Sequence, residues 1–162
     1  MLKVIGIGNR LMMDDGIAIA VLEVLKHKLE SMSIEVIIGE TDSLFVFHQL
    51  KEDDFAIILD ATYSERVAGS VHSCSLQEVL TSYEKAGYQH DTSLFDLLRL
   101  YSQPLTGWLI GIEIAEAKFG CELSDVLMLK FNDICLEVEE IISNCLCWRR
   151  KHESRRLFNQ IY

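Results

Sequence analysis

The first seventeen residues constrain the fold more than any other part of the chain, because they predict a strand, a tight loop and a helix. Residues 2–7 form a short apolar run, and Gly6 and Gly8 lie at its end. Glycines at the carboxyl end of a strand let the backbone turn and approach a ligand closely. A segment with helical apolar periodicity then covers residues 17–29.

Two adjacent acids, Asp14 and Asp15, stand directly before this helix. Carboxylates at a helix start are stabilised by the positive end of the helix dipole. Either residue could therefore serve only as a helix cap. The pair gains interest because polar residues also follow later predicted strands.

The rest of the chain alternates between strand and helix patterns. Predicted strands cover residues 34–38, 55–59 and 108–112, with a short edge strand at 70–73. Predicted helices cover residues 43–50 and 76–83. Another helix is expected to open at 90–92, and Ser124 is expected to cap the last one. A strand that is apolar throughout, such as 55–59, is typical of a parallel sheet. We expect an α/β fold, a three-layer sandwich whose twisted, mostly parallel sheet of about five strands carries helices on both faces.

The size and charge of the chain predict one acidic domain with a basic end. The chain has 162 residues, 49% of them apolar, enough for a single core. Residues 149–162 hold five basic side chains against one acid, a charge of +4 that leaves −14 on residues 1–148. We expect a single α/β domain at 1–148 and a basic C-terminal tail at 149–162. An acidic body argues against nucleic acid as a partner.

The chain has no apolar run long enough to span a membrane, and its first residues lack the pattern of a cleavable signal. We therefore expect a cytoplasmic protein without a membrane partner. Its five cysteines are an odd number without paired spacing, which predicts buried thiols rather than disulfides.

Ligands of open α/β sheets bind beyond the carboxyl ends of the strands, and this rule selects candidate residues. Asp15 follows the first strand, Asp60 follows the third, and His90 lies in a loop that could fold over the same edge. Each has a plain alternative, since a strand-end carboxylate often only bonds loop amides and a loop histidine is seldom a ligand. Together they would form a partly open site of oxygen and nitrogen ligands, suited to zinc, nickel or manganese.

A dinucleotide site is the other interpretation of Gly6 and Gly8. The fingerprint requires a third glycine where this chain has Leu11. The two acids that follow would also repel a pyrophosphate. Nucleotide binding is therefore disfavoured.

The opening segment 6–16, which reads GIGNRLMMDDG, resembles the first motif of the hydrogenase maturation proteases. The resemblance continues at 57–61 (IILDA), at the His90 loop followed by Leu94, and at 109–113 (LIGIE), and it extends to about residue 145. These endopeptidases trim the large subunit of nickel-iron hydrogenases, and their α/β sandwich agrees with the fold expected above.

The resemblance implies a function and a site. A hydrolase of this kind, an aspartic-type endopeptidase acting as a monomer, removes the C-terminal extension of a hydrogenase precursor after nickel insertion. The family's metal-contacting positions match Asp15, Asp60 and His90, and the nickel is supplied by the substrate, although other divalent metals could replace it in a crystal. The substrate-binding loops would contain four further residues, Gly8, Asn9, Glu40 and Thr41. Whether the metal or a carboxylate activates water stays open.

Three residues depart from the family pattern. Ala18 replaces a usual glycine, Glu40 replaces the second glycine of a Gly-Gly-Thr turn, and Ile114 replaces a proline after the fifth strand. Glu40 is expected to face the cleft and to affect the choice of substrate. Another function is compatible with the same three ligands, namely a nickel-binding or nickel-sensing protein without peptidase activity.

Overall fold

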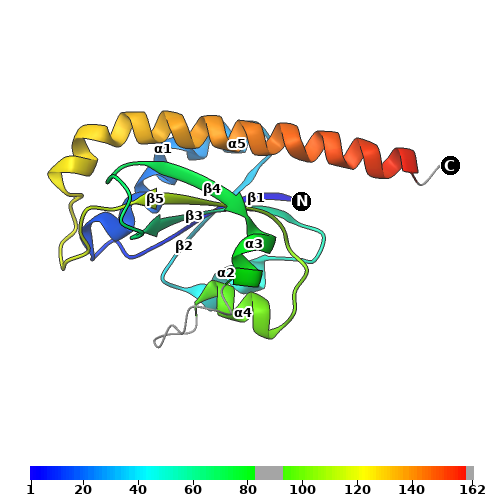
Figure 1. The fold of residues 1–162 in the computed structure, drawn as a ribbon, viewed down its shortest axis with the longest axis horizontal. Coiled ribbons are helices and arrows are strands. Elements are labelled where there is room, and N and C mark those ends of the chain that lie inside the picture. Colours follow the sequence, from blue (N-terminus) through cyan, green and yellow to red (C-terminus); the bar gives the residue numbers. More distant parts are fainter. Residues whose placement is uncertain (83–92, 160–162) are drawn as a thin grey trace.

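The fold is a five-stranded sheet between two layers of helices, seen in a computed structural model that describes residues 1–82 and 93–159, with side chains up to residue 152 (Figure 1). The strands are β1 (Leu2–Ile7), β2 (Glu35–Glu40), β3 (Phe55–Thr62), β4 (Val71–Ser75) and β5 (Thr106–Glu113). Their order is β2-β1-β3-β5-β4, parallel except for β4, which pairs antiparallel with β5 at one edge. The expected α/β sandwich and its short edge strand are confirmed.

Helices cover both faces of the sheet. They are α1 (Ile17–Ser31, after the 3-10 turn η1 at Met13–Gly16), α2 (Ser43–Gln49), α3 (Leu76–Ser82), α4 (Leu94–Leu100) and α5 (Asp125–Asn159). Helices α1 and α5 lie on one face, and α2, α3 and α4 lie on the other (Figure 1).

Strand β3 shows why the sheet is buried on both sides. Ile57 and Leu59 point toward α1 and α5, whereas Ala56 and Ile58 point toward α2 and α4, because successive side chains alternate between faces. A strand between two apolar layers therefore has no polar position until it leaves the core. Phe55 to Leu59 form such a run.

Strands β2, β3, β4 and β5 all extend further than the sequence patterns predict, and the extensions of β3 and β2 affect the candidate site. Strand β3 continues to Thr62, so Asp60 lies within the strand and pairs with Gly111 rather than following the strand's end. Strand β2 likewise continues to Glu40. Backbone pairing with a neighbouring strand keeps a polar residue extended where hydrophobic periodicity alone would end the strand.

Helix α4 begins after Ser93, whose hydroxyl accepts a hydrogen bond from the Asp96 N–H while the Asp96 carboxylate accepts one from the Ser93 N–H. This capping box fixes the helix start. The expected opening of the helix at residues 90–92 lies outside the described residues.

Helix α5 is a single helix of 35 residues, about 52 Å long at 1.5 Å per residue. The predicted cap is confirmed, since the Ser124 hydroxyl accepts a hydrogen bond from the Leu127 N–H. The helix is continuous across residues 148 and 149, and the division of the chain there stays a prediction. No helix in the described part of the chain is both long and apolar enough to cross a membrane.

The cysteines are free thiols, but the expectation that they are buried is wrong for two of them. Cys135 and Cys145 are buried, Cys74 is half-buried, and Cys121 and Cys147 are exposed. Cys147 lies two residues from Cys145 on α5, and this spacing turns it toward another side of the helix.

A buried ion cluster closes the amino-terminal edge of the sheet. Asp54 accepts hydrogen bonds from the Met1 amino group and the Lys51 N–H, and its carboxylate lies 2.8 Å from the Lys3 ammonium. Burial acts to raise the pKa of Asp54, but the hydrogen bonds from Lys3, the amino terminus and Lys51 outweigh it and lower that pKa to about 2. This edge lies opposite the one that carries the predicted site.

Candidate functional site

A cleft of about 550 Å³ opens at the carboxyl ends of the parallel strands. These ends lie together at the left of Figure 1. The loops after β1 and β2 and the end of β3 form much of its wall, together with parts of α3 and α4. Asp15, Asp60, Gly8, Glu40 and Thr41 all line it. Asp15 and Asp60, which the strand-end rule selected, therefore lie in one cleft.

The loop after β1 holds Asp15 in place. The Asn9 N–H donates to Oδ2 of Asp15 over 2.7 Å, and the Asn9 side chain accepts from the Leu11 N–H over 2.9 Å. Gly8 has a φ of 140°, and a Cβ there would lie 2.1 Å from the Asp15 carbonyl oxygen. Glycine is thus required for the close passage of the strand end past the start of the helix.

Asp14 points the other way and is completely buried. Its carboxylate accepts hydrogen bonds from the backbone N–H groups of Ala115, Glu116 and Ser124 and from the Ser124 hydroxyl, over 2.6–3.2 Å. These contacts join η1 to the connection between β5 and α5. Asp14 is therefore the structural member of the acidic pair, and Asp15 is the one at the cleft.

Asp60 lies on β3 beside the cleft and faces a charged neighbour. Burial, followed by the negative charge of Asp15, raises the pKa of Asp60 to about 7, against a smaller opposing effect of the Ala61 N–H. Two carboxylates held close together in a partly dry cleft attract a cation. The same geometry makes one of them able to carry a proton near neutral pH.

Glu40 occupies a position that favours glycine. Its φ of 49° lies in the left-handed region, where most side chains cost free energy. Its carboxylate accepts a hydrogen bond from the Arg10 Nε over 2.8 Å, and Arg10 also bonds both carboxylate oxygens of Glu23. The glycine expected from the family pattern is thus explained by backbone geometry, and Glu40 puts an ion-paired side chain on the cleft wall.

The other two departures lie in packed regions. Ala18 is fully buried on α1, and its carbonyl oxygen would lie 3.5 Å from a Cβ placed at Gly6. The Ile114 N–H donates to the Thr62 carbonyl over 2.9 Å, a bond that proline could not make. Ile114 therefore adds one hydrogen bond between the ends of β3 and β5.

His90 lies outside the described residues. Among the residues that the structure describes, no group of three or more histidine, cysteine, aspartate or glutamate side chains is placed to hold a metal ion. Asp15 and Asp60 are the two predicted ligands that the structure describes, and both line the cleft. The predicted third ligand stays a prediction.

The sequence patterns did not single out Glu113. It is buried at the end of β5, and its carboxylate accepts hydrogen bonds from the hydroxyls of Thr62 and Ser64 and from the backbone N–H groups of Ser64 and Arg66. These bonds fix the loop that leaves β3 at the cleft. The sequence signal that could have pointed to Glu113 is its position as a charged residue directly after the apolar run 108–112.

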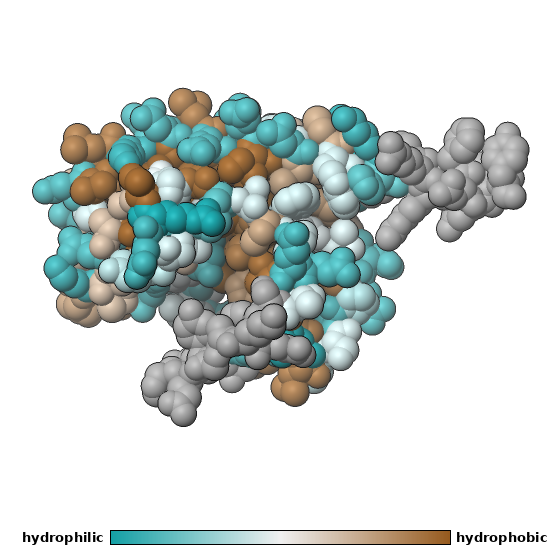
Figure 2. Space-filling model, viewed as in Figure 1, coloured by the Kyte–Doolittle hydropathy of each residue, from teal (hydrophilic) through white to brown (hydrophobic). Residues whose placement is uncertain are grey.

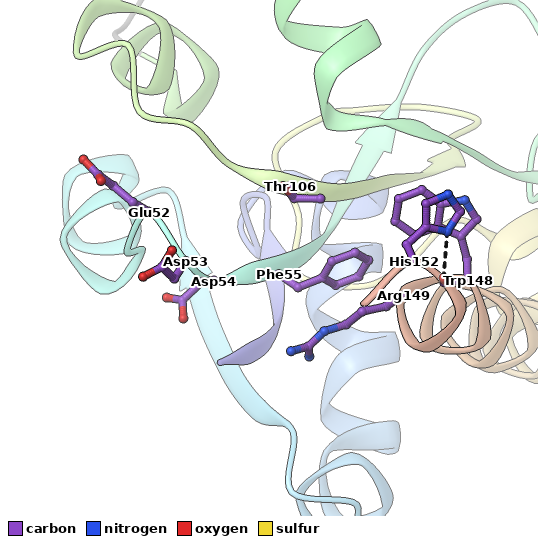
Figure 3. Close-up of a pocket in the computed structure, with 8 residues that line it drawn as sticks. All are labelled: Glu52, Asp53, Asp54, Phe55, Thr106, Trp148, Arg149 and His152. Atoms are coloured by element: carbon purple, nitrogen blue, oxygen red, sulfur yellow. Dashed lines mark hydrogen bonds between the residues drawn. The ribbon is translucent and has the colours of Figure 1, made fainter. Parts of the chain in front are cut away.

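A second cavity, of about 190 Å³, lies at the opposite edge of the sheet and contains none of the predicted site residues. Figure 3 shows Trp148 and His152 of α5 stacked on one side of it, with their rings 3.8 Å apart, and Glu52 and Asp53 on the other side. The Arg149 guanidinium lies 5.5 Å from the centre of the Phe55 ring. At this cavity α5 packs against Phe55 at the start of β3.

Comparison with known proteins relates the chain to solved structures. No protein-family model matches it, and no curated protein matches it. The hydrogenase-maturating endopeptidase HybD from E. coli is similar with a TM-score of 0.70 at 19% identity, over 88% of this chain and 92% of that one.

Two proteins from Thermococcus kodakarensis are similar as well. The NiFe hydrogenase maturation protease HybD has a TM-score of 0.66 at 23% identity, covering 86% of this chain and 97% of that one. The NiFe hydrogenase maturation protease HycI has a TM-score of 0.66 at 18% identity, covering 90% and 91%. The expected fold is that of these proteases.

The two acids of the opening segment should differ in their effect on folding. Asp14→Asn should lower the free energy of unfolding by about 2–4 kcal/mol, because an amide cannot accept all the buried hydrogen bonds that the carboxylate accepts. Asp15→Asn, the matched control, should change it by less than about 1 kcal/mol. Urea unfolding measures both. Equal losses would contradict the assignment of Asp14 as the structural acid.

Asp60 should make the metal-free protein less stable as the pH rises. Its pKa is about 7 in the folded protein, above the ordinary value of 3.8, so between these values the folded state keeps a proton that the unfolded state has lost. Stability therefore falls from about pH 4 to pH 7 and stays reduced above. Asp60→Asn should therefore raise the free energy of unfolding above that of wild type. This increase should be about 1–3 kcal/mol larger at pH 8 than at pH 5.

Urea unfolding with a chelator present, at both pH values, gives this difference. Asp42→Asn is a suitable control, because Asp42 caps α2 and lies outside the set of residues that line the cleft. If Asp60→Asn raises the free energy of unfolding equally at pH 5 and pH 8, Asp60 is not held protonated.

Proposed function

We propose that this protein is a hydrolase, a hydrogenase maturation endopeptidase that removes the C-terminal extension of a nickel-iron hydrogenase large-subunit precursor after nickel insertion. The observation that carries the proposal is the meeting of Asp15 and Asp60 in one cleft at the strand ends of this fold. The similar structures are named as proteases of this kind. In this proposal the protein acts as a cytoplasmic monomer.

The nickel of the precursor is the recognised part of the substrate. Asp15 and Asp60 supply carboxylate oxygens, and His90 supplies an imidazole nitrogen, a mixed set that suits nickel. Burial and the charge of Asp15 hold the pKa of Asp60 at about 7, and an arriving dication relieves that cost. A precursor without nickel lacks this anchor and binds poorly, which accounts for cleavage only after metal insertion.

The reaction is the hydrolysis of one peptide bond. Water adds to the carbonyl carbon, its proton passes to a base, the C–N bond breaks, and the amine leaves with a proton. In this proposal the base is a carboxylate of the cleft, Asp15 or Asp60, acting through an oxygen that does not hold the nickel. The substrate's nickel, held by these residues, would supply Lewis-acid chemistry toward the water or the carbonyl oxygen. Gly8, Asn9, Glu40 and Thr41 line or support the channel for the extension.

The central experiment incubates the protein with nickel-loaded precursor and measures the precursor's mass. Wild type should shorten it at the C-terminus, and Asp15→Asn should lower the rate by about a hundredfold or more while the melting temperature stays within a few degrees. Nickel-free precursor should stay intact. A folded wild-type protein that binds nickel but never shortens a precursor from the same organism would favour a nickel-binding or nickel-sensing protein instead.

Glu40 should influence which precursor is cleaved. Glu40→Gly relieves the left-handed backbone and removes the charge paired with Arg10, so the ratio of kcat/KM values for two different precursors should change by about tenfold. Glu40→Gln, which keeps the side chain's size, separates the charge from the backbone effect. Loss of nickel binding in Glu40→Gly would show that Glu40 acts as a ligand and not in substrate choice.

A further inference from the structure

The cleft that holds Asp15 and Asp60 also has an apolar side. Ile7, Val79 and Leu109, which we call the apolar floor, all line it. Each of the three is only partly buried, and each packs against the apolar layer between the sheet and helices α2, α3 and α4. In Figure 2, hydrophobic residues reach the surface near the centre of the view, among hydrophilic ones. One apolar layer of the fold thus reaches solvent inside the cleft.

Three elements that are far apart in the sequence build the floor. Ile7 is the last residue of β1, Val79 lies in the middle of α3, and Leu109 lies in β5. They pack in one cluster with Ile58 and Leu76, which are fully buried. Because the interior behind the floor is closely packed, a side chain that covers the floor loses water without any movement of the core.

Asp60 lies at the edge of the floor, on the same face of the sheet. It pairs with Gly111, and Leu109 lies two residues before Gly111 on β5, so both side chains point to that face. On the other side, the register of β1 with β3 places Ile7 next to Asp60 when it is continued by one residue. Two residues of a strand span about 6.6 Å. The carboxylate and the floor are therefore within reach of one short peptide.

The two sides of the cleft differ in chemistry. Asp15, Asp60 and Glu40 bring carboxylates to the cleft, whereas the floor has no polar side chain. Carboxylates bind a cation or a hydrogen-bond donor, but an apolar surface gains free energy only when an apolar group covers it. A ligand that fills this cleft therefore needs a cation at one end and an apolar group a short distance along its chain.

We propose that the apolar floor is a side-chain subsite, which selects an aliphatic residue of the substrate peptide close to the part anchored through nickel. This inference rests on the proposed function and deepens it by naming the class of side chain that the cleft accepts. An extended peptide advances about 3.3 Å per residue, so a residue about two positions from the anchor lies over the floor. A polar side chain there loses its water without gaining a hydrogen bond.

The floor selects among peptides and takes no part in the chemical step. None of its three side chains has a group that transfers a proton or holds a metal. A change of the floor should therefore alter Kd and kcat/KM in a way that depends on the peptide, and nickel binding should stay the same.

The first experiment changes the nickel-loaded precursor. Residues around the start of its C-terminal extension are replaced one at a time, by Asn and separately by an aliphatic residue. At one position, Asn should raise the Kd and lower kcat/KM by about tenfold or more, whereas the aliphatic residue should leave both within about threefold. Biolayer interferometry gives the Kd separately from the cleavage assay.

The second experiment places a complementary charge on the floor. Val79→Lys should lower kcat/KM for the natural precursor by about tenfold or more, and should favour a precursor that carries Asp at the selected position. Gln77→Lys is the matched control, because Gln77 lies on the same helix, is exposed, and is outside the set of residues that line the cleft. It should favour neither precursor.

Melting temperatures and nickel binding show whether the two lysine variants are folded. If Val79→Lys does not fold, Val79→Thr takes its place, because threonine keeps the shape of valine and adds one hydroxyl group. Val79→Thr should reduce the discrimination between the aliphatic precursor and the Asn precursor.

Each outcome decides the proposal. Cleavage of the Asn and aliphatic precursors at equal rates overturns the subsite and leaves the peptidase activity standing. An equal response of the Asp precursor to Val79→Lys and Gln77→Lys also overturns the subsite, since a general charge effect then explains it. If wild type binds the precursor without cutting it, only the peptidase activity is refuted, and the Kd ratios decide the subsite. Wild type that neither binds nor cuts the precursor overturns both.

Discussion

The hydrogen bonds received by the buried carboxylate of Asp14 determine the geometry on which the site depends. They tie η1 to the connection between β5 and α5, and they fix the direction of the next residue along the chain. With Asp14 turned inward, Asp15 is left at the cleft, where the Asn9 N–H orients its carboxylate. An ion that needs ligands in fixed positions requires such support behind them.

Much of the fold followed from periodicity in the sequence. The apolar strands, the helix at 17–29 and the cap at Ser124 were predictable because burial and capping leave local patterns. Polar strand ends were harder, since Asp60 and Glu40 stay extended through backbone pairing that no single segment reveals. The sequence could not predict that Asp14 is buried while Asp15 lines the cleft. This difference depends on the hydrogen bond from Ser124, which is 110 residues distant along the chain.

The candidate site was predictable in part for a topological reason. Parallel strands deliver their carboxyl ends to one edge, so residues after different strands meet even when they are far apart in sequence. That rule placed Asp15 and Asp60 together but gave no information about Glu113, which stabilises the wall of the cleft.

The central claim is that Asp15, Asp60 and His90 converge on one metal ion. A crystal structure of the protein grown with Ni²⁺ or Cd²⁺ tests it most directly, with anomalous scattering to locate the ion. The account predicts one ion in the cleft, with oxygens of Asp15 and Asp60 and a nitrogen of His90 in direct contact, at about 2.0–2.2 Å for Ni²⁺ by analogy with zinc. An ion bound elsewhere with the cleft empty, or His90 on the opposite edge of the sheet, would contradict it.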